Sequence, residues 1–239
     1  MNSKQQKVMV VGGSSGIGLA TAQRLAREGY DVIITARNQA HVDAALAKIA
    51  AKVAGVTLDY ADPASITAAF DQVGELDHLV ITAAGPAAWG PFADLSRDAL
   101  QAAFTNKFWG YFDTLQAALP HLGEHGSITL VSGAAARAAL PGTAGLAAVN
   151  GAIERMGVVL AKELAPRRVN VISPGVVDTP AYDWMAPDAR RGMLQGAADK
   201  LPVQRYGQAE DIAEGMLFLL RNPYVSGSVL DIDGGVRLG

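Results

Sequence analysis

Three glycines near the start of the chain have a spacing that suits phosphate binding. The segment VVGGSSGIG places Gly12, Gly16 and Gly18 between a short apolar run and an amphipathic segment. Glycine lets the backbone turn tightly and approach a pyrophosphate, while the N-terminus of the following helix presents free N–H groups to it. The sequence therefore predicts a dinucleotide site at a strand-to-helix junction, with the less common spacing Gly-x-x-x-Gly-x-Gly.

The end of the next apolar run, VIITARN, indicates which dinucleotide binds. A site for NAD usually has a carboxylate here, which accepts hydrogen bonds from the ribose. This chain has Ala36 followed by Arg37, and a guanidinium forms paired, charge-assisted bonds with a 2′-phosphate. We therefore expect NADP(H), with Ser14 and Asn38 as possible helpers. The alternative is that Arg37 only caps a loop.

These residues need a scaffold of alternating strands and helices, and the chain has that pattern. Segments with a period near 3.6 residues, such as 18–29, 41–52 and 151–165, lie between short apolar runs typical of buried parallel strands. The predicted strands are 7–13, 31–37, 54–60, 77–85, 126–133, 167–175 and 227–235.

This alternation predicts an α/β fold, a doubly wound parallel sheet of about seven strands forming one Rossmann domain over residues 1–239. Residues 176–208 have no strong period. Because loops beyond the carboxyl ends of such strands bind ligands, we expect this segment to be a lid; the alternative is a surface excursion without a role.

Composition excludes several classes of function. The chain of 239 residues is 50% hydrophobic, carries a net charge of −3 and has no cysteine. It has no basic stripe for nucleic acid, no thiolate chemistry and no apolar run long enough for a signal peptide or membrane helix. We expect a cytoplasmic protein with a small-molecule substrate and no nucleic-acid or membrane partner. We also expect no metal, since His121 and His125 have a spacing compatible with a metal but no evident third ligand.

Several motifs together resemble the short-chain dehydrogenase/reductase family. The glycine motif matches with Val11 at the family's threonine position, and TAAG (82–85), TNKFWG (105–110), LVSG (130–133) and SPGVVDTP (173–180) are similar to later motifs. VSGSVLDIDGG closes the chain as in the family. The resemblance implies Asn106 as the catalytic asparagine, Ser132 as the catalytic serine, and a homodimer or homotetramer.

The resemblance, with the glycine and Arg37 arguments, gives a set of cofactor-binding residues. They are Gly12, Ser14, Ser15, Gly16, Ile17, Gly18, Arg37, Asn38, Asp59, Tyr60, Ala83, Ala84, Gly85, Asn150, Pro174, Gly175, Val177 and Thr179.

The family's proton-donating tyrosine, and the lysine four residues after it, are absent. Alignment from AKELAP (161–166) places Leu146 and Asn150 at these positions, and no tyrosine of the chain has a lysine four or seven residues later. Leucine cannot donate a proton. The amide of Asn150 can bind ribose hydroxyls but has no charge to lower a neighbouring pKa.

Three hypotheses follow from this absence. The protein is a reductase with another acid, for which Tyr182 is the first candidate and Asp183 the second, although Tyr182 could simply pack beside Trp184. Alternatively it reduces an imine, which arrives protonated and needs no acid. The third hypothesis is an inactive nucleotide-binding sensor or regulatory subunit. The predicted substrate pocket is small and hydrophobic and comprises Trp89, Ser132, Leu146, Trp184 and Met185.

Overall fold

A single parallel sheet forms the centre of the molecule. The computed structural model describes residues 5–83 and 88–238. Seven strands pair in the order β3-β2-β1-β4-β5-β6-β9, all parallel, which confirms the predicted doubly wound Rossmann fold. The strands are β1 (Lys7–Val11), β2 (Asp31–Ala36), β3 (Val53–Thr57), β4 (Leu76–Ile81), β5 (Leu122–Val131), β6 (Arg168–Pro174) and β9 (Val229–Ile232), with β7 (Val177–Asp178) and β8 (Gly207–Gln208) forming a separate short pair.

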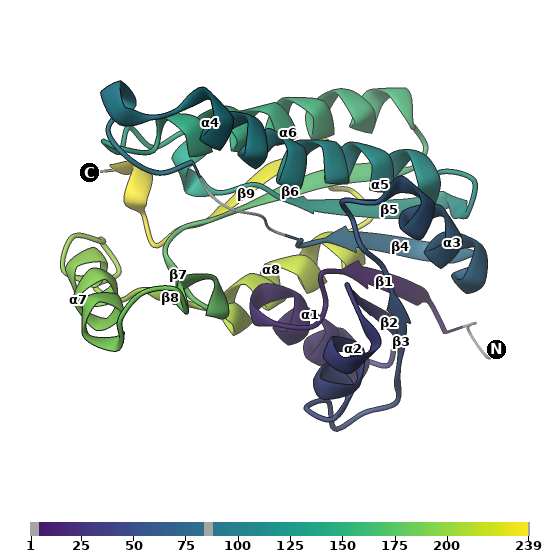
Figure 1. Cartoon of the computed structure of the whole chain (residues 1–239). Coiled ribbons are helices and arrows are strands. Elements are labelled where there is room, and N and C mark those ends of the chain that lie inside the picture. The colour runs from purple at the N-terminus through teal and green to yellow at the C-terminus, as the bar shows by residue number, and fades with distance from the viewer. Residues whose placement is uncertain (1–4, 84–87, 239) are drawn as a thin grey trace.

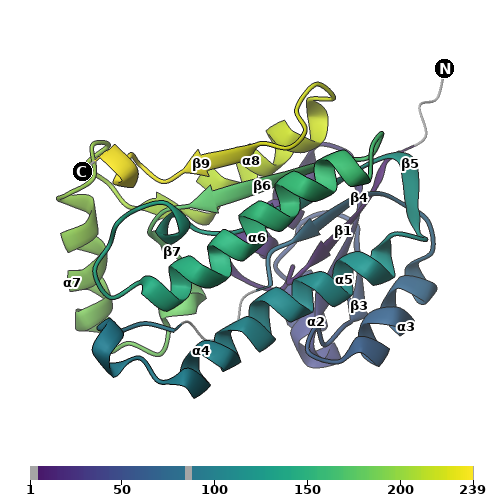
Figure 2. The same cartoon turned by 90° about the horizontal axis from the view of Figure 1, so that it is seen from above.

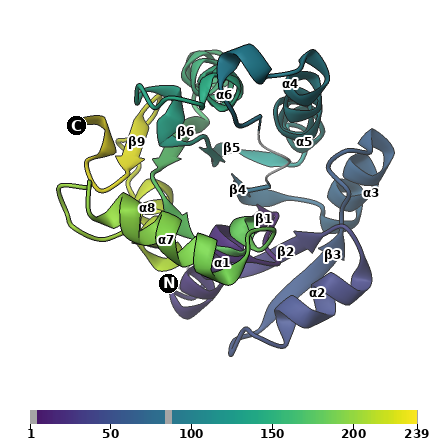
Figure 3. The same cartoon turned by 60° about the vertical axis from the view of Figure 1, so that its left-hand side comes forward.

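Helices cover both faces of the sheet (Figure 1). One face carries α3 (Pro63–Val73), α5 (Gly110–Ala118) and α6 (Ala144–Glu163), which Figure 2 shows from above. The opposite face carries α1 (Gly16–Arg27), α2 (Gln39–Leu46) and α8 (Ala209–Arg221). Two further helices, α4 (Arg97–Ala103) and α7 (Pro187–Ala198), lie beyond the sheet, and Figure 3 shows α7 in front of it.

Strand residues alternate between two cores, one on each face. Val8 and Val10 of β1 pack with α1 and α8, whereas Met9 and Val11 pack with α3, α5 and α6. This alternation follows from the pleat of the strand, and burial of both faces explains the continuous apolar runs in the sequence.

The strand order reverses between β1 and β4, and this crevice is where ligands bind in such sheets. The two loops that leave these strands come very close together, because a Cβ on Gly12 would lie 2.8 Å from the backbone nitrogen of Ala83. The predicted nucleotide loop therefore stands at the topological switch point.

Two of the departures from the predicted boundaries concern helices. The helix expected over 41–52 ends at Leu46, where a turn follows. The lid segment 176–208 contains the twelve-residue helix α7, whose buried residues are only Leu194 and Ala198. A helix with so few buried residues leaves little apolar periodicity to detect.

Candidate active site

The glycine loop joins β1 to α1 in a backbone conformation that few other residues adopt. Gly12 and Gly16 have φ of +83° and +49°, and a Cβ on Gly18 would lie 2.1 Å from the carbonyl oxygen of Gly12. The N-cap residue of α1, Ser15, makes no side-chain capping bond and is exposed. The first N–H groups of α1 can therefore serve an anion, as the spacing predicts.

The segment after β6 lies against this loop. A Cβ on Gly16 would be 3.3 Å from Cβ of Thr179. Pro174 ends β6, Gly175 passes so close to Asp233 that a Cβ would lie 2.7 Å from its Cα, and Val177 is buried in β7. Of the predicted cofactor residues of SPGVVDTP, Thr179 is thus brought to the glycine loop, while Pro174, Gly175 and Val177 lie in the segment that leads to it.

Thr82 binds the end of β4 to the glycine loop, a role that the motif comparison did not identify. Its hydroxyl donates to the carbonyl oxygens of Val11 at 3.0 Å and Gly12 at 3.2 Å. Ala83 is buried beside them, while the predicted contacts Ala84 and Gly85 lie outside the described residues.

A second group of predicted cofactor residues gathers beyond the ends of β2 and β3. Burial raises the pKa of the Tyr60 hydroxyl. The nearby positive charge of Arg37 opposes this shift, and the negative charge of Asp59 adds to it. These three side chains therefore lie within electrostatic reach of one another. Asn38 caps α2, since its Oδ1 accepts from the backbone N–H of His41 at 2.9 Å, so its amide oxygen already has a role in the fold.

Leu146 and Asn150 lie one turn apart at the start of α6. Leu146 is half-buried, and Asn150 is 2% exposed. Asn150 also approaches the backbone at the end of β5, because a Cβ on Gly133 would lie 2.8 Å from its Nδ2. The absence of a side chain at Gly133 gives this amide its room.

Lys107 reaches this amide from the opposite helix, and the sequence analysis did not single it out. Its Nζ donates to Oδ1 of Asn150 at 2.7 Å and to the carbonyl oxygen of Ser132 at 3.0 Å. Burial lowers the pKa of the ammonium to about 8, opposed by the negative charge of Glu154. Because an ammonium only donates, the atom of Asn150 that it meets must be the amide oxygen.

The hydroxyl of Ser132 is directed into the protein. It donates to Oε1 of Glu154 at 2.8 Å and also lies 3.3 Å from the carbonyl oxygen of Ile172, and Ser132 is 5% exposed. Glu154 in turn pairs with Arg137 at 3.2 Å. In this structure the proton of Ser132, the catalytic serine that the resemblance implies, is directed to the buried carboxylate of Glu154.

Asn106 also serves the backbone. It lies in the π-helical turn η2 (Phe104–Trp109) between α4 and α5, and its Nδ2 donates to the carbonyl oxygen of Ala102 at 2.8 Å. A π-helical turn leaves backbone groups out of the regular hydrogen-bond ladder, and this amide satisfies one of them.

The predicted acid and pocket residues come from two sides of the site. Burial raises the pKa of Tyr182; the negative charge of Asp178 adds to this shift and the positive charge of Arg190 opposes it. This phenol is therefore a weaker acid than an ordinary tyrosine. Trp184 is 77% exposed and, with Met185, precedes α7. Trp89, also exposed, lies beside Gly90, whose N–H donates to the carbonyl oxygen of Gly142 just before α6, the helix that carries Leu146.

The guanidinium of Arg190 connects several parts of the predicted lid to one another. Arg190 of α7 donates to Asp178 at 3.1 Å through Nε, to the carbonyl oxygen of Thr179 at 3.0 Å, and to Asp183. The strand β7, the turn η4 (Pro180–Tyr182) and α7 are thereby connected in one unit.

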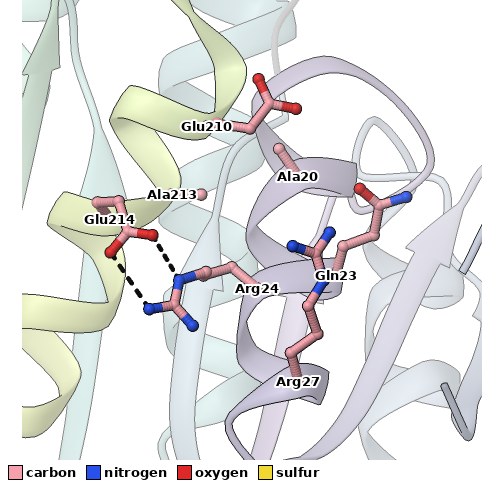
Figure 4. A pocket seen from close by; sticks show the side chains of 7 residues that line it. All are labelled: Ala20, Gln23, Arg24, Arg27, Glu210, Ala213 and Glu214. Atoms are coloured by element: carbon pink, nitrogen blue, oxygen red, sulfur yellow. Dashed lines mark hydrogen bonds and ion pairs between the residues drawn. The ribbon is translucent and has the colours of Figure 1, made fainter. Parts of the chain in front are cut away.

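A hollow elsewhere on the surface contains none of these residues. It lies between α1 and α8 (Figure 4), where Arg24 meets Glu214 at 2.5 Å. Over residues 5–83 and 88–238 there is no cluster of three or more side chains suited to a metal ion.

Comparison with known proteins places this site in a family. Residues 11–237 match the family model described as enoyl-(acyl carrier protein) reductase. An uncharacterized oxidoreductase of Methylorubrum extorquens is 35% identical over 99% of this chain and all of its own. The 3-oxoacyl-[acyl-carrier-protein] reductase of Bos taurus is 31% identical over 96% of this chain and 97% of its own.

A solved structure described as a small-chain dehydrogenase in complex with NADPH is also similar. It is 38% identical, has a TM-score of 0.86, and the match covers 99% of this chain and all of the other. The chain thus belongs to the short-chain dehydrogenase/reductase family, and it is an oxidoreductase of that type.

Proposed function

We propose that this protein is an NADP(H)-dependent reductase that transfers hydride to a small, hydrophobic carbonyl or imine substrate. The observation that carries the proposal is the glycine loop at the switch point, which meets Thr179 on one side and contacts Thr35 of β2, the strand before Arg37, on the other. The NADPH bound by the 38% identical structure supports the same cofactor here.

The residues present fit the phosphorylated form of the cofactor. The end of β2 offers Ala36 and the exposed Arg37 instead of a carboxylate. A guanidinium there would hold a 2′-phosphate, the N-terminus of α1 would hold the pyrophosphate, and Asn150 and Thr179 would face the nicotinamide half. When bound, NADPH would supply the hydride.

The proposed substrate class rests on the predicted pocket residues and on the missing acid. Leu146 and the aromatic residues Trp89 and Trp184 favour an apolar ligand. General acid catalysis typically contributes about 10²- to 10⁴-fold in rate, so reduction of a ketone needs a proton donor other than residue 146. An imine that arrives protonated does not.

The alternative is a nucleotide-binding protein without turnover. Leu146 cannot donate a proton, and the Ser132 hydroxyl is committed to Glu154. Such a protein would bind NADPH with the affinity of an enzyme and leave it unoxidised.

One assay separates the two functions. Consumption of NADPH by the purified protein is followed with a panel of ketones, enones and cyclic imines, beside the variant Leu146→Tyr/Asn150→Lys. Turnover by the unmodified protein supports the reductase. No turnover by the unmodified protein, combined with activity of the double variant, would contradict it and support a binding role.

We also propose a cytoplasmic homodimer or homotetramer. The support for the oligomer is α6, the one helix in the described part of the chain that is long and apolar enough to cross a membrane, with a mean hydropathy of 1.3 and 33% of its apolar window buried. By length and composition this helix departs from the expectation that no apolar run is so long, and we propose that a partner subunit rather than a membrane lies against it. Its exposed Val159 would be covered by a second copy. Light scattering of the purified protein and fractionation of cells test the two statements.

A further inference from the structure

Lys107 carries a positive charge that its hydrogen-bond partners do not neutralise. Two of its three N–H groups donate to neutral oxygens, those of Asn150 and Ser132. A buried ammonium is normally paired with a carboxylate. The nearby carboxylate, Glu154, already accepts from Ser132 and pairs with Arg137, so the charge of Lys107 is only partly balanced.

The position of this ammonium is fixed by the ends of two central strands. Beneath it, the hydroxyl of Tyr111 lies 3.1 Å from the carbonyl oxygens of Ile81 and Val131, the last residues of β4 and β5. The Nζ atom of Lys107 is 6.0 Å from the centre of the Tyr111 ring. The ammonium therefore stands just beyond the carboxyl ends of β4 and β5, beside the switch point where the nucleotide loop begins.

The π-helical turn places the side chain there. An extra residue in a helical turn rotates the side chains around it, and such turns are frequent at functional sites. Here the turn directs Lys107 toward Asn150 of α6, while the side chain of Asn106 donates to the backbone carbonyl oxygen of Ala102.

We propose that Lys107 is the proton donor of this site and that its ammonium selects neutral carbonyl substrates over iminium ions. This inference rests on the proposed reductase function. The carbonyl carbon gains a C–H bond from the hydride of NADPH, which is oxidised to NADP⁺, and the π electron pair moves to oxygen. An N–H bond of Lys107 breaks as the O–H bond forms, and the neutral amine then regains a proton from water.

Charge explains the selection. The oxygen of a ketone becomes negative as hydride arrives, and a fixed ammonium stabilises that charge. An iminium ion is repelled by the same ammonium and needs no proton. The charged or titratable groups around Lys107 are Glu154 on α6, Tyr111 on α5 and, beyond Glu154, Arg137.

The test uses three variants of the full chain. Lys107→Met removes the proton and the charge, and Lys107→Arg retains the charge but cannot release a proton at accessible pH. As a control, Lys162→Met removes an exposed lysine from α6, the helix that Lys107 contacts. Rates with ketones and cyclic imines are measured together with the Kd for NADPH and the thermal unfolding temperature.

We expect both Lys107 variants to lose about 10²- to 10⁴-fold in kcat with ketones. The Kd for NADPH should change less than about threefold in both variants, because binding does not require the proton. The rate with iminium substrates should stay within about threefold for Lys107→Arg, which keeps the charge, and should rise for Lys107→Met, which removes the repulsion. The control should match the unmodified protein. Equal losses with ketones and imines, together with a weaker Kd for NADPH, would show that Lys107 positions the cofactor and would overturn the proposal, as would full rescue by arginine.

The unmodified protein provides a test that does not depend on variant folding. Because the ammonium form is required, ketone reduction should decline as the pH rises through about 8, the pKa of Lys107. Competitive labelling of its amine, read by mass spectrometry, should give the same midpoint, and a midpoint above about 10, the ordinary lysine value, contradicts the proposal. Turnover of imines alone refutes this inference but leaves the reductase function standing, whereas a protein that oxidises no NADPH refutes both.

Discussion

Arg37 tests the choice of cofactor at a single side chain. It is exposed at the end of β2, so its removal leaves the core intact. We expect Arg37→Ala to weaken NADPH binding by about 10-fold or more, the loss of roughly 1.5–3 kcal/mol from hydrogen bonds to a charged group. NADH has no 2′-phosphate, and its Kd should stay within about twofold.

Fluorescence titration with both nucleotides measures these changes. Arg27→Ala, which removes an exposed arginine from the last turn of α1, is the matched control. If NADPH and NADH weakened together in the Arg37 variant, Arg37 would be a structural residue of the loop and the preference for NADP(H) would have another origin.

Residue-level prediction worked where a motif fixes the backbone and failed where chemistry depends on contacts between distant segments. The glycine loop has the predicted place because its conformation is local. Lys107 and Asn150 are 43 positions apart, and nothing in TNKFWG indicates that the lysine faces α6. The direction of the Ser132 hydroxyl likewise depends on Glu154, which no motif marks. The replaced tyrosine and lysine were themselves the signal that a donor should be sought elsewhere.

At the scale of elements, the approach of α1 to β1 depends on Gly18. A Cβ there would lie 2.1 Å from the carbonyl oxygen of Gly12 and 2.5 Å from Oγ1 of Thr82. The helix must shift to accept it, so we expect Gly18→Ala to lower the free energy of unfolding by about 2–4 kcal/mol, within the range of overpacked or strained sites. NADPH binding should weaken too.

Gly151 in α6 offers a control of the opposite sign. A Cβ at Gly151 meets nothing within 4 Å, so Gly151→Ala should raise stability by about 0.5–1 kcal/mol through helix propensity alone. Urea unfolding compares the two variants. Equal stabilities of the Gly18 variant and the unmodified protein would mean that the helix and loop are not closely fitted.

The strands were predictable because two buried faces require unbroken apolar runs, whereas the helix α7 inside the predicted lid was not. All seven strands of the main sheet overlap the predicted segments. The helix α7 escaped because it buries only Leu194 and Ala198 and is bound to its neighbours by Arg190. Ion pairs have no period in the sequence.

At the scale of the whole molecule, His78 predicts how stability responds to acid. It is 4% exposed, and burial lowers the pKa of its imidazole to about 4. The positive charge of Arg168 also lowers this pKa, whereas the negative charge of Asp77 raises it. The unfolded chain has the ordinary value near 6.5. Between these pH values the unfolded state binds a proton that the folded state does not, so stability rises with pH in this window and falls as the pH drops.

We therefore expect His78 to lower the free energy of unfolding, measured with urea, by up to about 3 kcal/mol at pH 4 relative to pH 7. Each unit of pKa difference corresponds to about 1.36 kcal/mol. His78→Phe should flatten that part of the profile, although it also removes the hydrogen bond to Ser127 at 2.8 Å. The exposed His125 gives the control, His125→Asn. An unchanged slope in the His78 variant would assign the acid sensitivity to carboxylates.

The guanidinium of Arg190 makes the lid self-supporting. Its partners Asp178, Thr179 and Asp183 all belong to the same short stretch of chain. These hydrogen bonds therefore form within the segment and do not involve the main sheet. Residues 178–190 are accordingly a cassette: exchanged as one piece among related scaffolds, they would carry their own geometry, and with it the placement of Tyr182 and Trp184. Exchange of any part alone would break the ion pairs that Arg190 makes with Asp178 and Asp183.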